Sequence, residues 1–276
     1  MPSRYLDENE LSGHREFRFD FERETLAGKA ILLAGATGGL GSATAALLAR
    51  EGARLVLGFR SNRERAETLA AFLEKLGAAA VSLVAGDLSD PAGREAYLAA
   101  CPEDLYGLVS FVGDPARFSA GPGRTAELQE ALEASWSENF LGPALLARLA
   151  AERMRAAGTP GAIVLFSTMQ AVGVFENSVA YAAPKAALLQ AARILAREFG
   201  GKPNIRVNVI APGATTAGMA ESSIRSGKYD GYIEQGVIPR FGRPEDVARA
   251  VRFFLQPDNY VTGQVLVVDG GLTLRR

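Results

Sequence analysis

The stretch from Ala30 to Gly41, Ala30-Ile31-Leu32-Leu33-Ala34-Gly35-Ala36-Thr37-Gly38-Gly39-Leu40-Gly41, decides the fold of this 276-residue chain. Its first five residues are apolar and too few for a helix, which is typical of a strand buried on both faces. The glycines that follow allow a sharp turn, because glycine adopts positive φ without steric cost. An alanine-rich helical segment comes next, from about Ser42 to Glu51. The stretch therefore predicts a strand, a tight turn and a helix in direct succession.

Further apolar runs repeat this pattern along the chain, with helical stretches between them. We expect strands at Arg54–Leu57, Val81–Val84, Leu105–Phe111, Ala162–Phe166, Ile205–Ile210 and Val265–Val268, and a helix from about Arg63 to Leu76. Buried strands that alternate with helices form βαβ units, which require a parallel sheet and right-handed crossovers. The sequence thus predicts a doubly wound α/β fold, a Rossmann-type sandwich with a mainly seven-stranded parallel sheet. We expect one such domain over residues 26–276.

The first 25 residues form a charged leader in which Phe17, Phe19 and Phe21 alternate with polar residues. This pattern fits a mobile tail, and it also fits a short arm that packs on a neighbouring subunit. The leader lacks the apolar core of a signal peptide, and the chain has no apolar run of about 18 residues. We therefore expect a cytoplasmic protein that does not cross a membrane.

Composition and charge exclude several classes of function. The formal net charge of −1 and the pI of about 6.0 provide no basic surface for nucleic acid. Cys101 is the one cysteine, so a disulfide within the chain and a thiolate metal cluster are excluded. His14 is the one histidine and lies in the leader, which disfavours a Ser-His-Asp or Cys-His hydrolase. We expect no metal site.

The glycine turn is suited to binding the pyrophosphate of a dinucleotide. Free N–H groups at the start of the following helix, together with the helix dipole, favour an anion there. Glycines alone would also fit a tight turn that binds nothing. The residues expected to hold the pyrophosphate are Gly35, Thr37, Gly38, Gly39, Leu40 and Gly41.

Tyr181 and Lys185 lie four residues apart, so on a helix they share one face. An ammonium beside a phenol is expected to lower the phenol's pKa, which lets it exchange a proton with a carbonyl oxygen. Pro184 suits the first turn of a helix, so we expect the helix to begin near Tyr181. The pair alone would also fit an ordinary contact on the surface.

Together these segments give the chain a pattern that resembles the short-chain dehydrogenase/reductase family over residues 26–272, especially members resembling 3-oxoacyl-carrier-protein reductases. The other matching segments are Asn208–Gly213, Gly242–Ala248 and Tyr260–Gly271. The resemblance implies a catalytic tetrad made of Asn139, Thr168, Tyr181 and Lys185. In that scheme Tyr181 is the acid/base and Lys185 also holds the nicotinamide ribose. Thr168 replaces the usual serine, and Ser167 is an alternative candidate for that position.

The resemblance also implies where a nicotinamide dinucleotide binds beyond the glycine turn. The matching residues are Arg60, Ser61, Asp87, Leu88, Gly113, Tyr181, Lys185, Pro212, Gly213 and Thr215. Phe59 takes the place of a carboxylate that would select NAD, and no acidic residue occurs from Gly58 to Arg63. Because Arg60 can pair with a 2′-phosphate, we expect NADP(H) to be preferred, with NAD(H) as the alternative.

The chain departs from the family pattern after the fourth strand, where Ser110-Phe111-Val112-Gly113 replaces the usual N-N-A-G. The leading hypothesis is a reductase that acts on a small ketone or alcohol, such as a 3-oxoacyl thioester or a sugar-like substrate. A dinucleotide-binding sensor or scaffold with little turnover is the alternative. Residues 217–239 are expected to form a lid over the cleft. The resemblance implies a homotetramer or homodimer, and the fold does not identify the substrate.

Overall fold

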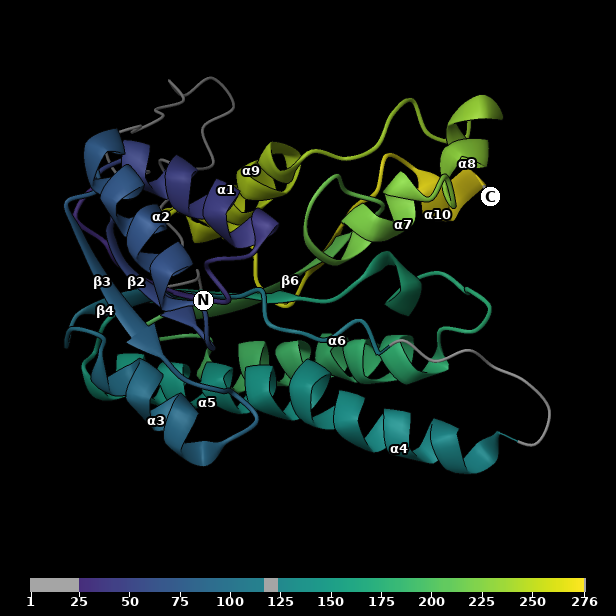
Figure 1. Ribbon diagram of the computed structural model, residues 1–276. Coiled ribbons are helices and arrows are strands. Elements are labelled where there is room, and N and C mark those ends of the chain that lie inside the picture. The colour runs from purple at the N-terminus through teal and green to yellow at the C-terminus, as the bar shows by residue number, and fades with distance from the viewer. Residues whose placement is uncertain (1–24, 117–123, 276) are drawn as a thin grey trace, which may run out of the picture.

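The computed structural model describes residues 25–116 and 124–275, and a parallel sheet forms its centre (Figure 1). Nearly all of the predicted leader lies outside the described residues. The strands are β1 (Ala30–Ala34), β2 (Arg54–Phe59), β3 (Ala80–Ala85), β4 (Leu105–Ser110), β5 (Gly161–Phe166), β6 (Ile205–Pro212) and β7 (Val265–Val268). They pair in the order β3-β2-β1-β4-β5-β6-β7, and every pairing is parallel. The predicted doubly wound fold is confirmed.

Helices cover both faces of this sheet (Figure 1). One face carries α1 (Gly39–Arg50), α2 (Arg63–Leu76) and α9 (Pro244–Leu255). The other carries α3 (Pro91–Ala99), α4 (Thr125–Trp136), α5 (Gly142–Ala156) and α6 (Val179–Phe199). The short helical segments are η2 (Ser137–Leu141), η3 (Met169–Ala171), η4 (Gly218–Ala220), α7 (Glu221–Arg225), α8 (Asp230–Glu234) and α10 (Leu272–Arg275). None of the described helices is both long and apolar enough to cross a bilayer.

The central strands are apolar along their whole length because helices pack on both of their sides. Every residue of β1, β4 and β5 is buried. Successive residues of a strand face opposite sides of the sheet. Leu32 accordingly packs in the core beneath α5 and α6, whereas Ile31 packs in the core beneath α1 and α9. The edge strands β3 and β7 are partly exposed.

The strand order places the predicted site residues at one edge of the sheet. The order reverses between β1 and β4, and such switch points open a crevice at the carboxyl ends of parallel strands. The glycine turn follows β1, Asp87 follows β3, Gly113 follows β4 and Thr168 follows β5. Helix α6 begins at Val179, two residues before the expected start, so Pro184 lies in its second turn.

Candidate active site

The glycine turn leaves the N-terminus of α1 open. Gly35 has φ +78°, a conformation that permits the chain to reverse directly after β1. Gly38 precedes the helix and provides no side chain to cap its free N–H groups. A Cβ at Gly41 would lie 2.6 Å from the Gly35 carbonyl oxygen, and one at Gly39 would lie 2.8 Å from the Ala217 Cβ. The turn therefore has the close backbone approach and the unpaired donors that an anion requires.

A cavity of about 420 Å³ lies over this turn. The predicted residues that line it are Gly35, Thr37, Gly38, Gly39, Leu40, Gly41, Arg60, Asp87, Leu88 and Gly113. Ser61 does not line it. β2 ends at Phe59, and the side chain of Asn62 already caps α2 by accepting a hydrogen bond from the Arg65 N–H. Ser61 itself is exposed and lies outside the lining of this cavity.

Arg60 is held at this cavity by two carboxylates that the sequence reasoning did not pair with it. Its Nη1 lies 3.4 Å from Glu138 Oε1 and 3.8 Å from Asp87 Oδ2. Asp87 Oδ1 accepts hydrogen bonds from the backbone N–H and the hydroxyl of Ser89. These bonds, and to a lesser extent the charge of Arg60, hold the pKa of Asp87 below its usual range. The adjacency of Glu138 to Asn139 in the sequence was the signal that could have drawn attention to it.

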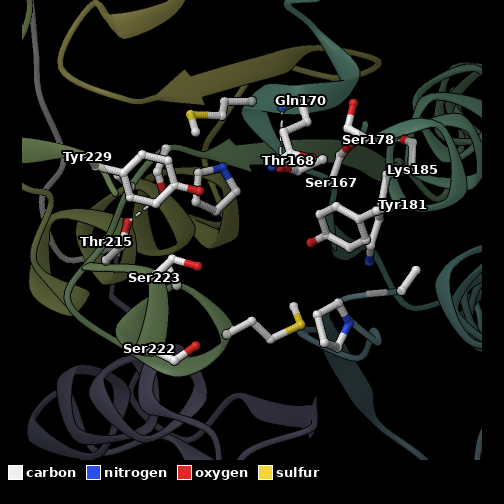
Figure 2. Close-up of a pocket in the computed structure, with 18 of the residues that line it drawn as sticks. Ser167, Thr168, Gln170, Ser178, Tyr181, Lys185, Thr215, Ser222, Ser223 and Tyr229 are labelled. Atoms are coloured by element: carbon white, nitrogen blue, oxygen red, sulfur yellow. Dashed lines mark hydrogen bonds between the residues drawn. The ribbon is translucent and has the colours of Figure 1, made fainter. Parts of the chain in front are cut away.

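A second cavity, of about 870 Å³, contains the predicted catalytic side chains (Figure 2). The predicted residues that line it are Leu40, Thr168, Tyr181, Lys185, Pro212, Gly213 and Thr215. Leu40, Phe111, Ala217 and Met219 line both cavities, so the two spaces meet at these side chains. One elongated ligand could therefore extend from the glycine turn to Tyr181.

The structure distinguishes the two candidates for the hydroxyl that accompanies Tyr181. Ser167 Oγ donates to the backbone oxygen of Lys185 at 2.8 Å, which ties it to helix α6. The Thr168 side chain lowers the pKa of the Tyr181 phenol, and its Oγ1 accepts weakly from the Gln170 N–H at 3.3 Å. The geometry therefore favours Thr168 over Ser167 as the partner of the phenol.

Tyr181 does not have the pKa that the sequence reasoning expected. Burial raises the pKa of its phenol to about 12, and the hydrogen bond from Thr168 opposes this only in part. The carboxylate of Asp114 acts in the same direction as burial. The amine of Lys185 makes its hydrogen bonds elsewhere, so the expected lowering of the phenol pKa by this lysine is wrong for the structure described.

Lys185 is 2% exposed and donates to two backbone carbonyl oxygens, those of Val112 at 3.1 Å and Phe166 at 3.0 Å. Burial lowers the pKa of its amine to about 7. Two acceptors match the two N–H bonds of a neutral amine, whereas an ammonium has three donors to satisfy. The two hydrogen bonds and the lowered pKa thus both favour a neutral Lys185 amine.

Asn139 lies behind the cavities rather than in their walls. Its amide donates to the Asp114 carbonyl oxygen at 2.9 Å and to Ser135 Oγ at 2.8 Å, and its Oδ1 accepts from the Asp114 N–H at 3.0 Å. A Cβ at Gly113 would lie 2.6 Å from Asn139 Oδ1 and 2.9 Å from Lys185 Nζ. Because Gly113 has no Cβ, the side chains of Asn139 and Lys185 can both approach its backbone closely. Asn139 also fixes the loop that follows β4, through its hydrogen bonds to Asp114.

The altered segment after β4 repacks the wall between the two cavities. The ring centroid of Phe111 lies 4.5 Å from that of Phe166, so two aromatic rings pack where β4 and β5 end. The hydroxyl of Ser110 is buried and has no hydrogen-bond partner among the described residues. The usual polar floor is replaced here by an aromatic one.

The predicted lid over residues 217–239 divides into two parts. Met219 and Tyr229 line the larger cavity, and Figure 2 shows Tyr229 opposite Tyr181 with both hydroxyls directed inward. Tyr232 and Ile233 instead pack on a small core that contains Met169, Ile238 and Leu272. The second part therefore anchors the lid to the domain.

Comparison with known proteins agrees with this geometry. Residues 35–273 match the family model described as Enoyl-(Acyl carrier protein) reductase. D-threitol dehydrogenase of Mycolicibacterium smegmatis is 31% identical over 274 residues, which cover 96% of this chain and 98% of that protein.

Two solved structures superpose closely on this one. A short-chain type dehydrogenase/reductase from Mycobacterium ulcerans has a TM-score of 0.82 at 28% identity, over 91% of this chain and 92% of that chain. A 7α-hydroxysteroid dehydrogenase complexed with NADH and 7-oxo glycochenodeoxycholic acid also has a TM-score of 0.82, at 26% identity, over 94% of this chain and 99% of that chain. By these matches and by its sheet, this chain belongs to the short-chain dehydrogenase/reductase family of oxidoreductases that act on CH–OH and C=O groups.

Proposed function

We propose that this protein catalyses hydride transfer between a nicotinamide dinucleotide, NADPH in preference to NADH, and a small ketone or secondary alcohol. One observation carries the proposal. The phenol of Tyr181 and the hydroxyl of Thr168 share a cavity that adjoins a second, glycine-lined cavity at an uncapped helix N-terminus. The first supplies acid/base groups for a carbonyl oxygen, and the second suits a pyrophosphate.

The residues present fit the dinucleotide. The close packing at Gly39 and Gly41 leaves backbone rather than side chains facing the glycine-lined cavity, where the adenosine and pyrophosphate would be held. Lys185, Pro212, Gly213 and Thr215 would hold the nicotinamide end. When bound, the dinucleotide supplies the hydride in reduction or accepts it in oxidation.

Tyr181 and Thr168 would bind the substrate oxygen between their hydroxyl groups. A phenol with its ordinary pKa of about 10 already carries a proton at neutral pH, and burial, which raises the pKa of Tyr181 to about 12, favours the protonated form further. It can donate that proton to the oxygen of a ketone, and it must lose the proton first to act on an alcohol. The site is therefore better prepared for reduction than for oxidation at neutral pH.

Gly39→Val should weaken binding of both NADPH and NADH by about tenfold or more, because the added side chain must displace Ala217 and the Gly218 backbone. The measurement is a titration of the fluorescence of the bound reduced nucleotide. Gly231→Ala is the matched control, since its nearest heavy atom would be Gln235 Nε2 at 3.7 Å and it lines neither cavity. Unchanged affinity in the Gly39 variant would show that the turn is not the nucleotide site.

The proposed preference for NADPH rests on Arg60. It is the one positively charged side chain among the described residues around the glycine-lined cavity. Arg60→Gln should weaken NADPH binding by about tenfold and NADH binding by less than about twofold. The same fluorescence titration measures both affinities. An equal loss for the two nucleotides would show that Arg60 does not contact the 2′-phosphate.

Phe111 and the unpartnered Ser110 hydroxyl favour one competing function, a dinucleotide sensor or scaffold with little turnover. The deciding experiment follows nicotinamide absorbance while the protein is mixed with NADPH, then NADH, over ketones, aldehydes and acetoacetyl thioesters. Consumption of NADPH supports the reductase, and the best substrate identifies the class. Binding without turnover of any compound supports the sensor. A homodimer or homotetramer and a cytoplasmic location remain predictions from the sequence.

A further inference from the structure

The glycine-lined cavity is more acidic than the segment Gly58–Arg63, which contains no acidic residue, suggests. Its described lining residues include one arginine, Arg60, and three carboxylates, those of Asp87, Asp114 and Glu138, and two of these, Asp87 and Glu138, lie within 4 Å of Arg60. A 2′-phosphate carries close to two negative charges at neutral pH. A 2′-phosphate that binds next to Arg60 therefore also lies near these acidic groups and is repelled by them. An unphosphorylated ribose is neutral and is repelled much less.

Glu138 is the carboxylate best placed to oppose such a phosphate. Its Oε1 is 3.4 Å from Arg60 Nη1, closer than Asp87 Oδ2 at 3.8 Å, and its side chain is 33% exposed against 41% for Asp87. Asp87 is also committed to Ser89 through two hydrogen bonds. Among the described contacts, the Glu138 carboxylate accepts one hydrogen bond, and Arg60 donates it.

The backbone holds Glu138 in this position. It lies on η2, the π-helical segment between α4 and α5, directly before the buried Asn139. The side chain of Asn139 is fixed by three hydrogen bonds to Ser135 and Asp114. Glu138 is thus presented to the cavity directly before a side chain that is fixed by hydrogen bonds, and Arg60 is the more exposed partner, with 63% of its side chain exposed.

We propose that Glu138 is a specificity-determining residue that limits the preference for NADPH, because it both occupies Arg60 and repels the 2′-phosphate. The proposal rests on the proposed binding of a nicotinamide dinucleotide. An unphosphorylated ribose presents a 2′-hydroxyl, which a carboxylate can accept as a hydrogen bond, so Glu138 does not penalise NADH. The acid that moderates cofactor choice therefore comes from a helix rather than from the end of β2.

The test measures binding of two nucleotide fragments by calorimetry, so it does not depend on turnover. 2′,5′-ADP carries the phosphate that distinguishes NADPH, and 5′-AMP lacks it. Glu138→Gln should strengthen binding of 2′,5′-ADP by about tenfold and change that of 5′-AMP by less than about twofold. Glu130→Gln removes the same charge from an exposed position on α4 outside both cavities and should alter neither affinity. Adding Arg60→Gln to the Glu138 variant should abolish most of the gain.

The outcomes separate this proposal from the function on which it rests. An unchanged ratio of the two affinities in Glu138→Gln overturns it, and so does an equal gain for both fragments, which would reflect net charge alone. A variant with a lowered melting temperature is replaced by Glu138→Ala and judged by the same ratio. If wild-type protein binds neither fragment nor NADH, the dinucleotide function itself fails. If NADH binds and the ratio does not move, only the role of Glu138 fails.

Discussion

Replacing Tyr181 with phenylalanine is expected to lower kcat by about a thousandfold or more in ketone reduction. The change removes one oxygen, which is the proton donor in the proposed reaction and the partner of Thr168. The ring remains to fill the same space, so the affinity for NADPH should stay within about twofold of wild type. Steady-state kinetics with the best substrate of the panel and a nucleotide titration measure the two quantities separately.

Tyr229→Phe is the matched control for this prediction. Tyr229 also lines the larger cavity and directs its hydroxyl inward from the opposite side (Figure 2). It is not hydrogen-bonded to Thr168 in the contacts described, so its loss should affect KM more than kcat, and kcat by less than about tenfold. If the Tyr229 variant loses turnover while the Tyr181 variant keeps it, the proton donor has been assigned to the wrong phenol.

The sequence predicted the sheet well because a strand covered by helices on both sides must be apolar along its whole length. This composition is visible without knowledge of the neighbours, and it marked β1, which is buried along its whole length, at the residues where the structure has it. The glycine turn was visible for a similar reason, since the close approach at Gly39 and Gly41 excludes other residue types. The strand β1 and the glycine turn could be predicted because each is determined by residues that are close together in the sequence.

The features that were missed depend on contacts between distant parts of the chain. Arg60 and Glu138 are 78 residues apart, so a search of Gly58–Arg63 for acidic residues could not find the carboxylate that faces Arg60. The pKa of Tyr181 was predicted in the wrong direction for the same reason. The spacing to Lys185 was correct, but the burial that dominates the pKa comes from the assembled cavity.

Lys185→Met is expected to lower kcat by about a hundredfold and to change how stability depends on pH. Burial lowers the pKa of the Lys185 amine to about 7, from its ordinary value of 10.5 in the unfolded chain. Between these values the unfolded state binds a proton that the folded state does not, so wild-type stability should rise with pH across this window. Below about pH 7 both states carry the proton, and above about pH 10.5 neither does, so the effect ends at both limits.

The methionine variant lacks this titration, although it also loses the hydrogen bonds to Val112 and Phe166 at every pH. Its melting temperature relative to wild type should therefore be highest near pH 7 and fall by about 5 °C as the pH rises to 10. Lys75→Met, at an exposed position at the end of α2, controls for loss of a surface charge. A difference between Lys185→Met and wild type that stays constant with pH would mean that Lys185 keeps its proton in the folded protein. The two carbonyl oxygens would then hold an ammonium, and the phenol of Tyr181 would face a fixed positive charge at neutral pH.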